Sequence, residues 1–269
     1  MKKRLQRLIQ IALMLFVFGM MLTNVKAQTV GSQIRIGADS TISYWNGTAW
    51  IAVPPGLPGQ SLQFTNGVPA WVYTDIDGNA YNSVTIGTQT WMKQNLNVTH
   101  YRNGDAIPNV IDNTAWSNIT TGAYCNYEND ANVAIYYGRL YNWYSVVDSR
   151  NLCPTGWHVP SDAEWTILTD YLGGANIAGS KLKETGTLHW NSPNTGATNQ
   201  SGFTALPGGY RENEGTFYDV KIVGSWWSST ESSVSNAWFR NMYSFDYFPD
   251  IDRHDYFKQR GFSVRCLKD

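Results

Sequence analysis

The chain has 269 residues and a formal net charge of −1, and the Lys and Arg residues that follow its N-terminal segment do not cluster. Binding to nucleic-acid phosphates needs a concentrated basic face, so this charge pattern argues against nucleic acid as a partner. Charged residues make up 15%, whereas Trp, Tyr and Gly number 12, 16 and 24, which predicts a loop-rich, β-leaning protein.

Residues 1–27 have the pattern of a secretory signal peptide. Basic residues lie within positions 2–7, an apolar run spans Ile11 to Leu22, and Val25-Lys26-Ala27 places small residues where cleavage before Gln28 requires them. The alternative is a membrane anchor, but the apolar run is short for a span. We therefore expect a secreted or cell-surface mature chain with no membrane span after signal cleavage.

Residues 28–73 are predicted to form a β-hairpin spacer or arm. Asn46-Gly47 and Asn66-Gly67 each favour a type I′ turn, and aromatic and β-branched residues flank both of them. The segment 54–59 separates the two hairpins as a Pro-Gly-rich spacer. An arm of this size is too small to bury a sizeable core of its own.

A larger domain is expected over residues 74–269, and two helices are predicted within it. Leu140, Trp143, Tyr144 and Val147 have the i, i+3, i+4, i+7 spacing of one apolar stripe. The second helix begins at a capping box formed by Ser161 and Glu164, and Gly173-Gly174 ends it; Trp165, Leu168 and Leu172 would line its buried face.

Five motifs along this domain carry a family resemblance. They are Tyr137–Tyr144, Cys153–Trp165, Gly202–Arg211, Trp226–Glu231 and Gly261–Cys266. In this order and spacing the chain resembles the Fibrobacter succinogenes major paralogous domain family over roughly residues 75–269, a family related to the C-type-lectin-like and formylglycine-generating-enzyme folds. The resemblance implies an α+β, C-type-lectin-like fold: two helices beside a small, loop-rich antiparallel sheet, preceded here by the short β-hairpins.

Three cysteines are present, Cys125, Cys153 and Cys266. Secretion permits disulfides, and a bond from Cys153 to Cys266 would link the end of the domain to its centre. Cys125 would then be a free thiol, buried among Tyr124 and Tyr127. The alternative is that all three are reduced core residues.

Catalytic and metal-binding patterns are weak in this sequence. Cys153 and His158 suggest a Cys–His dyad, but no third residue that would orient them is evident. His100, His158, His189 and His254 are scattered, without the spacing of a zinc site. The segment Asp75–Asn79 lacks the EF-hand pattern, since Ala80 and Ile86 occupy the positions that need Gly and Glu. We therefore expect no enzyme activity and no cofactor, with calcium left open because the acidic loops offer oxygen ligands.

The stretch from Tyr243 to Phe257 is the candidate ligand-binding surface. It mixes aromatic residues, Arg and short polar residues, as recognition loops do, because such side chains give large contact areas at low entropy cost. Trp238, Phe262 and Val264 should point inward and fix its ends. The alternative is a set of edge strands whose aromatic residues complete the core. The candidate binding residues are Tyr243, Phe245, Asp246, Tyr247, Asp250, Asp252, Arg253, His254 and Tyr256.

These patterns lead to three hypotheses about function. The first is a secreted, non-catalytic module that binds an extracellular glycan or protein through the C-terminal region. Every residue from Tyr243 to Phe257 has a codon that ends in a pyrimidine, so this stretch is also a candidate target of a diversity-generating retroelement. The second is a structural or adhesive envelope protein without a specific small ligand, and the third is a polysaccharide-active enzyme. The sequence leaves the ligand and the oligomeric state open.

Overall fold

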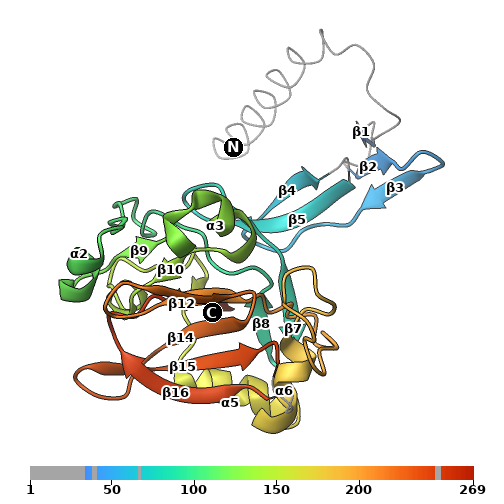
Figure 1. Cartoon of the computed structure of the whole chain (residues 1–269). Helices are drawn as coiled ribbons and strands as arrows, with labels where there is room; N and C mark the ends of the chain where they lie inside the picture. Colours follow the sequence, from blue (N-terminus) through green and yellow to red (C-terminus); the bar gives the residue numbers. More distant parts are fainter. Residues whose placement is uncertain (1–33, 38–40, 66–67, 246–249) are drawn as a thin grey trace. The chain divides into compact units, whose positions relative to one another are not determined.

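The computed structural model describes residues 34–37, 41–65, 68–245 and 250–269 (Figure 1). The predicted signal peptide, residues 1–27, lies outside the described residues. Contacts divide the chain into two compact units, one of Met1–Pro55 with Gln63–Ala70 and one of Gly56–Leu62 with Trp71–Asp269. Within the described ranges, no helix has the length and apolar character needed to cross a membrane.

The smaller unit contains an antiparallel sheet of β1 (Ile34–Ile36), β2 (Ile42–Trp45) and β3 (Trp50–Val53). The first predicted hairpin is present, but the predicted type I′ turn is wrong: Trp45 pairs with Trp50 across residues 46–49, and of Asn46 and Gly47 only Gly47 has a positive φ. Gly47 has a φ of 101°, and the Oδ1 atom of Asn46 accepts hydrogen bonds from the backbone amides of Thr48 and Ala49. The second predicted turn, at Asn66-Gly67, lies outside the described residues; β4 (Gln60–Thr65) and β5 (Val68–Thr74) flank it and are neighbours in a sheet with β6 (Ala80–Tyr81).

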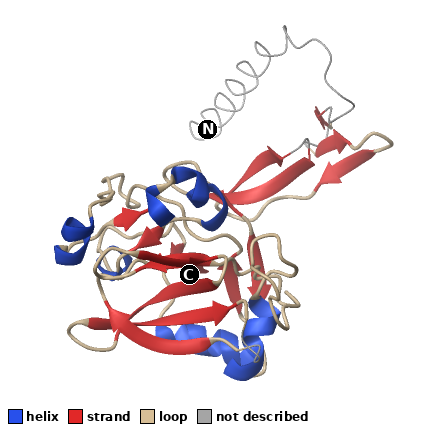
Figure 2. Cartoon of the chain, in the orientation of Figure 1, coloured by secondary structure: helices blue, strands red, loops and turns tan. Residues whose placement is uncertain are grey.

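The larger unit is built mainly from strands, with helices at its periphery (Figure 2). One four-stranded sheet has the order β11-β17-β8-β7, and a five-stranded sheet has the order β13-β12-β14-β15-β16. The bounds of the first sheet are β7 (Ser83–Ile86), β8 (Gln89–Met92), β11 (Trp157–His158) and β17 (Leu267–Lys268). Those of the second are β12 (Gly208–Arg211), β13 (Phe217–Val220), β14 (Val223–Glu231), β15 (Asn236–Tyr243) and β16 (Asp252–Phe257). A short pair, β9 (Tyr124–Cys125) and β10 (Leu140–Tyr141), completes the strands.

The predicted α+β class is confirmed, but the prediction of two helices and one small sheet is wrong. The described residues contain five sheets, five α-helices and one 3-10 turn. The helical segments are α2 (Asn113–Asn118), η2 (Tyr127–Asn129), α3 (Ala131–Tyr137), α4 (Trp143–Val146), α5 (Asp162–Tyr171) and α6 (Ala175–Leu182).

The second predicted helix is present as α5, and its capping box is complete. The Ser161 hydroxyl accepts from the Glu164 amide, and the Glu164 carboxylate accepts from the Ser161 amide. The first predicted helix is much shorter than its apolar stripe. Leu140 pairs with Cys125 in a strand instead, and the Asn142 side chain caps α4 by accepting from the Ser145 amide, so the helix starts only at Trp143.

The predicted disulfide between Cys153 and Cys266 is present, with a Cα–Cα distance of 6.1 Å. It joins the chain end to the middle of the larger unit. Cys125 is a buried free thiol, as expected. It packs in a small cluster with Trp116 and Tyr127, whereas Tyr124 belongs to the neighbouring core cluster. Trp143 and Trp165 of the predicted helices are buried, as are Trp157 and Trp226.

Candidate functional site

The C-terminal strands of the five-stranded sheet place alternate residues on two different faces. β15 and β16 are antiparallel, and Phe239 is paired with His254 while Arg240 is paired with Arg253. Since successive side chains of a strand point to opposite faces, the even-numbered residues of β16 share a face with the odd-numbered residues of β15. The predicted binding stretch therefore does not form one surface.

The face that carries Arg253 is occupied by helix α5, which packs along β14 and β15 (Figure 1). Arg240 and Arg253 both bind the Asp162 carboxylate of α5, with N–O distances of 2.7 and 2.8 Å. Burial raises the pKa of Asp162, but the hydrogen bonds from Arg253 and Arg240 outweigh it and hold that pKa below its ordinary value. Arg253 also stacks on Trp238, with its guanidinium carbon 3.4 Å from the ring centroid. These two contacts connect β16 to α5 and to β15.

The opposite face carries a cavity of about 400 Å³, which we call the sheet hollow. Its aromatic walls are Tyr210, Phe239, Tyr243, Tyr256 and Phe262. Its polar and charged groups are Asp219, Ser225, Asn241, His254, Asp255 and Arg260. Aromatic walls with a few convergent polar groups are typical of small-molecule sites. We therefore take the sheet hollow as the candidate functional site.

Arg260 lines the sheet hollow and makes an ion pair and ring contacts within the protein. Its guanidinium makes a bidentate ion pair with Glu212 and stacks on Tyr256, 3.2 Å from the ring centroid. The ring centroid of Tyr210 is 5.3 Å from the same guanidinium carbon. Burial and the nearby carboxylates of Asp219 and Glu212 raise the pKa of Tyr210, so its hydroxyl keeps its proton at neutral pH.

Asn241 is the buried polar group of the sheet hollow, with 5% of its surface exposed. Its Nδ2 atom donates to the Tyr243 hydroxyl at 2.5 Å. Its Oδ1 atom is buried and has no hydrogen-bond partner within the described part of the chain. An unpaired buried carbonyl of this kind costs about 1–3 kcal/mol, which a ligand that donates a hydrogen bond would recover.

Two acidic residues border the sheet hollow, Asp219 and Asp255, and the side chain of Asp255 is on the opposite face of β16. Asp219 has a left-handed backbone, with φ at 63°. The Asp255 carboxylate accepts from the Ser232 hydroxyl at 2.8 Å and from Asn236 Nδ2 at 3.2 Å. These hydrogen bonds lower the pKa of Asp255, which keeps it charged at neutral pH.

Of the predicted binding residues, Tyr243, His254 and Tyr256 line the sheet hollow. Asp252 is half-buried, with its carboxylate 3.9 Å from His254 Nε2. Phe245 is exposed beside Tyr243, with their ring centroids 5.7 Å apart, and Asp250 is half-buried. Asp246 and Tyr247 lie outside the described residues.

Sequence reasoning missed several residues of the sheet hollow: Tyr210, Asp219, Ser225, Phe239, Asn241 and Arg260. The alternation of Ala237, Phe239, Asn241 and Tyr243 was the available signal, because a period of two predicts that they share one face of a strand. Of the three positions expected to point inward, Phe262 and Val264 are buried. Trp238 is only half-buried. It lies on the α5 side of the sheet, where Arg253 stacks on its ring.

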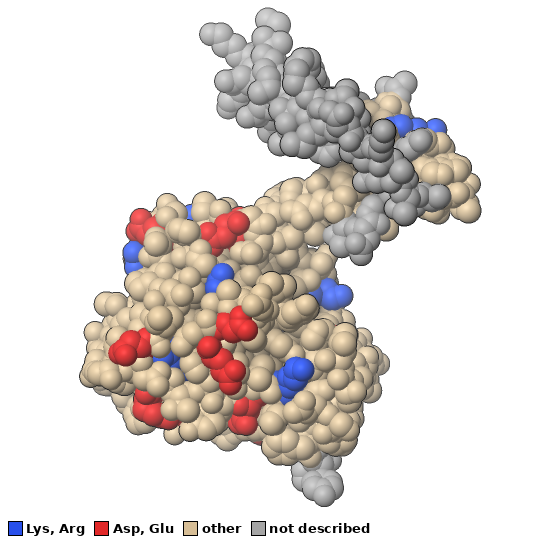
Figure 3. Space-filling model, turned by 45° about the horizontal axis from the view of Figure 1, so that its top comes forward, with Lys and Arg blue, Asp and Glu red and all other residues tan. Residues whose placement is uncertain are grey.

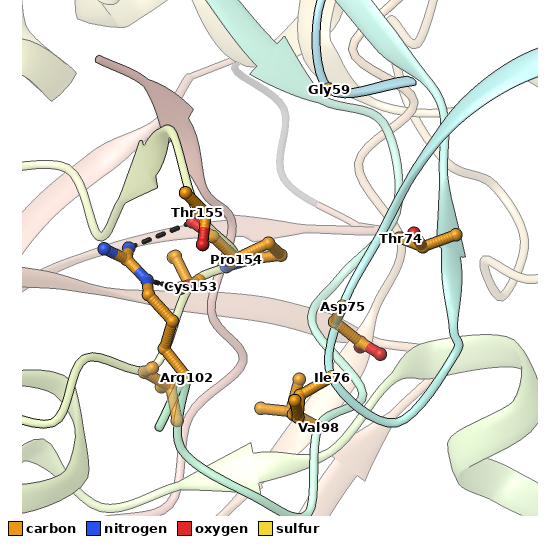
Figure 4. A pocket seen from close by; sticks show the side chains of 10 residues that line it. Gly59, Thr74, Asp75, Ile76, Val98, Arg102, Cys153, Pro154 and Thr155 are labelled. Carbon is orange, nitrogen blue, oxygen red and sulfur yellow. Dashed lines mark hydrogen bonds between the residues drawn. The ribbon is translucent and has the colours of Figure 1, made fainter. Parts of the chain in front are cut away.

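A second cavity, of about 310 Å³, lies beside the disulfide, but its two charged side chains, Arg102 and Asp75, are already engaged (Figure 4). Arg102 donates to the backbone carbonyls of Cys153, Pro154 and Trp157. The Asp75 carboxylate accepts from the amides of Asp77 and Asn79 and from the Tyr81 hydroxyl. These groups stabilise a turn and a loop, so their hydrogen-bonding atoms already have partners within the protein.

The residues considered for a Cys–His dyad make other contacts in the structure. Cys153 is in the disulfide, so it cannot act as a thiolate nucleophile there. His158 lies between Asp269 and Glu164, with N–O distances of 2.7 and 3.0 Å. Within the same ranges, no three His, Cys, Asp or Glu side chains are grouped to hold a metal ion. On the face drawn in Figure 3, Lys and Arg side chains lie apart from one another.

The fold and the site define a disulfide-linked α+β domain with an aromatic and polar hollow on one face of its main sheet. Residues 84–268 match the model of the Fibrobacter succinogenes major domain, and the chain belongs to this family. Neither the curated proteins nor the solved structures contain a match to the chain.

Proposed function

We propose that this protein is a secreted or cell-surface, non-catalytic recognition module that binds an extracellular glycan in the sheet hollow. The signal-peptide pattern of residues 1–27 and the disulfide support an extracytoplasmic location, where disulfides persist. The C-type-lectin-like relationship of the family is part of this proposal.

The observation that carries the proposal is the composition of the sheet hollow. Tyr243 and Tyr256 present ring surface beside the Asn241 amide and the His254 imidazole in a cavity of about 400 Å³. A sugar ring offers apolar C–H surface on one side and hydroxyls around its edge, which suits aromatic walls with convergent polar groups. Tyr243, His254 and Tyr256 also belong to the candidate diversified stretch, which would let related copies recognise different ligands.

A structural or adhesive envelope role is the second candidate, and large exposed apolar side chains favour it. Ile135 and Tyr136 of α3 and Leu188 are 71%, 63% and 78% exposed. Exposed apolar surface marks interaction sites on soluble proteins, and such surface serves adhesion without any specific small ligand.

A glycan array followed by calorimetry tests the recognition proposal. Tyr256→Ala should weaken binding of the identified glycan roughly tenfold or more, because a large aromatic wall is lost. Phe257→Ala is the matched control, since it is the adjacent residue of β16, lies on the opposite face and is similarly exposed, at 44% against 37%. Equal losses in the two variants, or no glycan bound at all, would contradict the proposal.

A further inference from the structure

Building on the recognition function proposed above, we infer that the sheet hollow selects a saccharide that is rich in hydrogen-bond donors and carries no anionic group. Asn241 and Asp219 are the residues that determine this specificity. Two observations lead to this inference: the balance of charges around the cavity and the unpaired carbonyl at Asn241.

The charges around the sheet hollow are unfavourable for an anion. Asp219 borders it, and within the described residues its carboxylate takes part in no ion pair. Asp255 also borders the cavity, but its side chain is on the opposite face of β16, where Ser232 and Asn236 bind its carboxylate. The one arginine of the cavity, Arg260, is neutralised by its bidentate pair with Glu212. A ligand carboxylate, sulfate or phosphate would meet the like charge of Asp219, and no unpaired Lys or Arg among the residues that line the cavity would offset it.

His254 does not reverse this balance. Its imidazole is 58% exposed, and its Nε2 atom lies 3.9 Å from the Asp252 carboxylate. The cavity stays acidic, and its carboxylate and carbonyl groups are hydrogen-bond acceptors.

The side-chain carbonyl of Asn241 favours a ligand that can donate a hydrogen bond to it. Its Oδ1 atom is buried without a partner, while the Nδ2 atom of the same amide donates to Tyr243. A hydroxyl or an ammonium group of a ligand supplies the missing donor, whereas a carboxylate or sulfate oxygen does not. Neutral sugars and amino sugars share the chemistry that this site requires.

Asp219 offers a clean way to test the role of charge. Its backbone is left-handed, with φ at 63°, and Asn is among the residues that adopt this conformation most readily. Asp219→Asn therefore keeps the shape of the side chain and the backbone while it removes one negative charge. Asp170→Asn is the matched control, because it removes one exposed carboxylate on α5, outside the sheet hollow.

The experiment measures binding of three hexasaccharides to the full chain by calorimetry at pH 7 and low salt. One is a neutral glucose oligomer, one is a glucosamine oligomer with free amino groups, and one is a galacturonic acid oligomer. We expect the wild type to bind the neutral or the amino-sugar oligomer and to reject the uronic acid oligomer.

The variants then separate charge from hydrogen bonding. Asp219→Asn should strengthen binding of the uronic acid oligomer about fivefold and weaken that of the amino-sugar oligomer by a similar factor, with a smaller effect on the uncharged neutral oligomer. Asp170→Asn should change none of the three. Asn241→Ala should weaken every bound oligomer about tenfold, and its unfolding curve shows whether the domain remains folded.

The outcomes distinguish a failure of the specificity inference from a failure of the proposed recognition function. If the wild type binds the uronic acid oligomer best, and Tyr256→Ala abolishes that binding, the specificity inference is wrong while the recognition function stands. An unchanged rejection of the uronic acid oligomer by Asp219→Asn also overturns the inference. If neither these oligomers nor any glycan on the array binds, the proposed function itself fails.

Discussion

Arg265 and Asn95 form a buried hydrogen bond between two distant parts of the chain, with 2.8 Å between Nη2 and Oδ1. Neither residue is exposed by more than 5%. The same Asn95 oxygen accepts from the Trp226 indole at 2.8 Å, and Arg265 also donates to the carbonyls of Met92 and Phe203. A single arginine thus connects β8, β14 and the C-terminal segment behind the sheet hollow.

Arg265→Lys should lower the free energy of unfolding by about 2–4 kcal/mol. Lysine lacks the planar fork that reaches several acceptors at once, so buried carbonyls lose their donors. Urea denaturation measures the change. Arg150→Lys, at a side chain that is 38% exposed, is the control and should stay within about 1 kcal/mol of the wild type. Equal effects of the two substitutions would show that the buried network contributes little.

The disulfide should contribute about 4–5 kcal/mol on the chain-entropy model, because it closes a loop with a sequence separation of 113. Replacing Cys153 and Cys266 together by Ser should therefore lower the unfolding free energy by roughly that amount. Peptide mapping of oxidised protein should link these two residues and leave Cys125 as the free thiol. A link that involves Cys125 would be incompatible with the structure.

Trp165→Ala should destabilise the larger unit by about 3–5 kcal/mol, because it empties a large buried aromatic site. Trp165 is fully buried, with its ring centroid 4.7 Å from that of Trp91. Ile167→Ala on the same helix is the control, since Ile167 is 51% exposed and alanine favours the helix. A melting temperature that Trp165→Ala leaves unchanged would contradict this packing.

Stability should depend on pH through the contact of His158 with Glu164 and Asp269. Burial lowers the pKa of His158, but hydrogen bonds to Asp269 and Glu164 outweigh it and raise that pKa above the ordinary 6.5. A group whose pKa is raised by folding contributes fully below its unfolded pKa, so this contribution is present below pH 6.5 and is lost as pH rises through the folded value.

The pKa of Glu164 shifts in the opposite direction. Burial raises it, but hydrogen bonds from Ser161 and His158 lower it below the ordinary 4.5, so its contribution is lost as pH falls through the folded value. We expect His158→Gln to remove the decline of stability above pH 6.5 that urea titrations of the wild type should show. An identical pH profile in the two proteins would rule out this contact as the cause.

Sequence patterns correctly predicted those elements whose stabilising contacts join residues close together in the chain. The capping box at Ser161 fixes the start of α5, and Asn46-Gly47 fixes a turn, because in each case the partners are a few residues apart. The apolar stripe at Leu140 was misleading, since Leu140 pairs with Cys125 in a strand that the helical period does not reveal. Tertiary pairing outweighed the local period there.

The sheet hollow was only partly predictable for the same reason. Tyr243, His254 and Tyr256 were found from the composition of one stretch, but Tyr210 and Asp219 reach the cavity from β12 and β13. Arg253 was assigned to the binding surface because composition cannot tell which face of a strand a residue occupies. The strand register and the position of Asp162 on α5 decide that it faces the helix.

The anchoring of β16 to α5 through Arg253 has a consequence for how this protein tolerates sequence change. On one face of β16, Arg253 binds Asp162 of α5. Positions 252, 254 and 256 lie on the other face, which is the face of the sheet hollow. In a library that randomises 252–256, folded and secreted members should be enriched for Arg at 253 and show broad residue usage at 254 and 256. Such a strand can acquire new ligand preferences by substitution at alternate positions while the scaffold behind it stays constant.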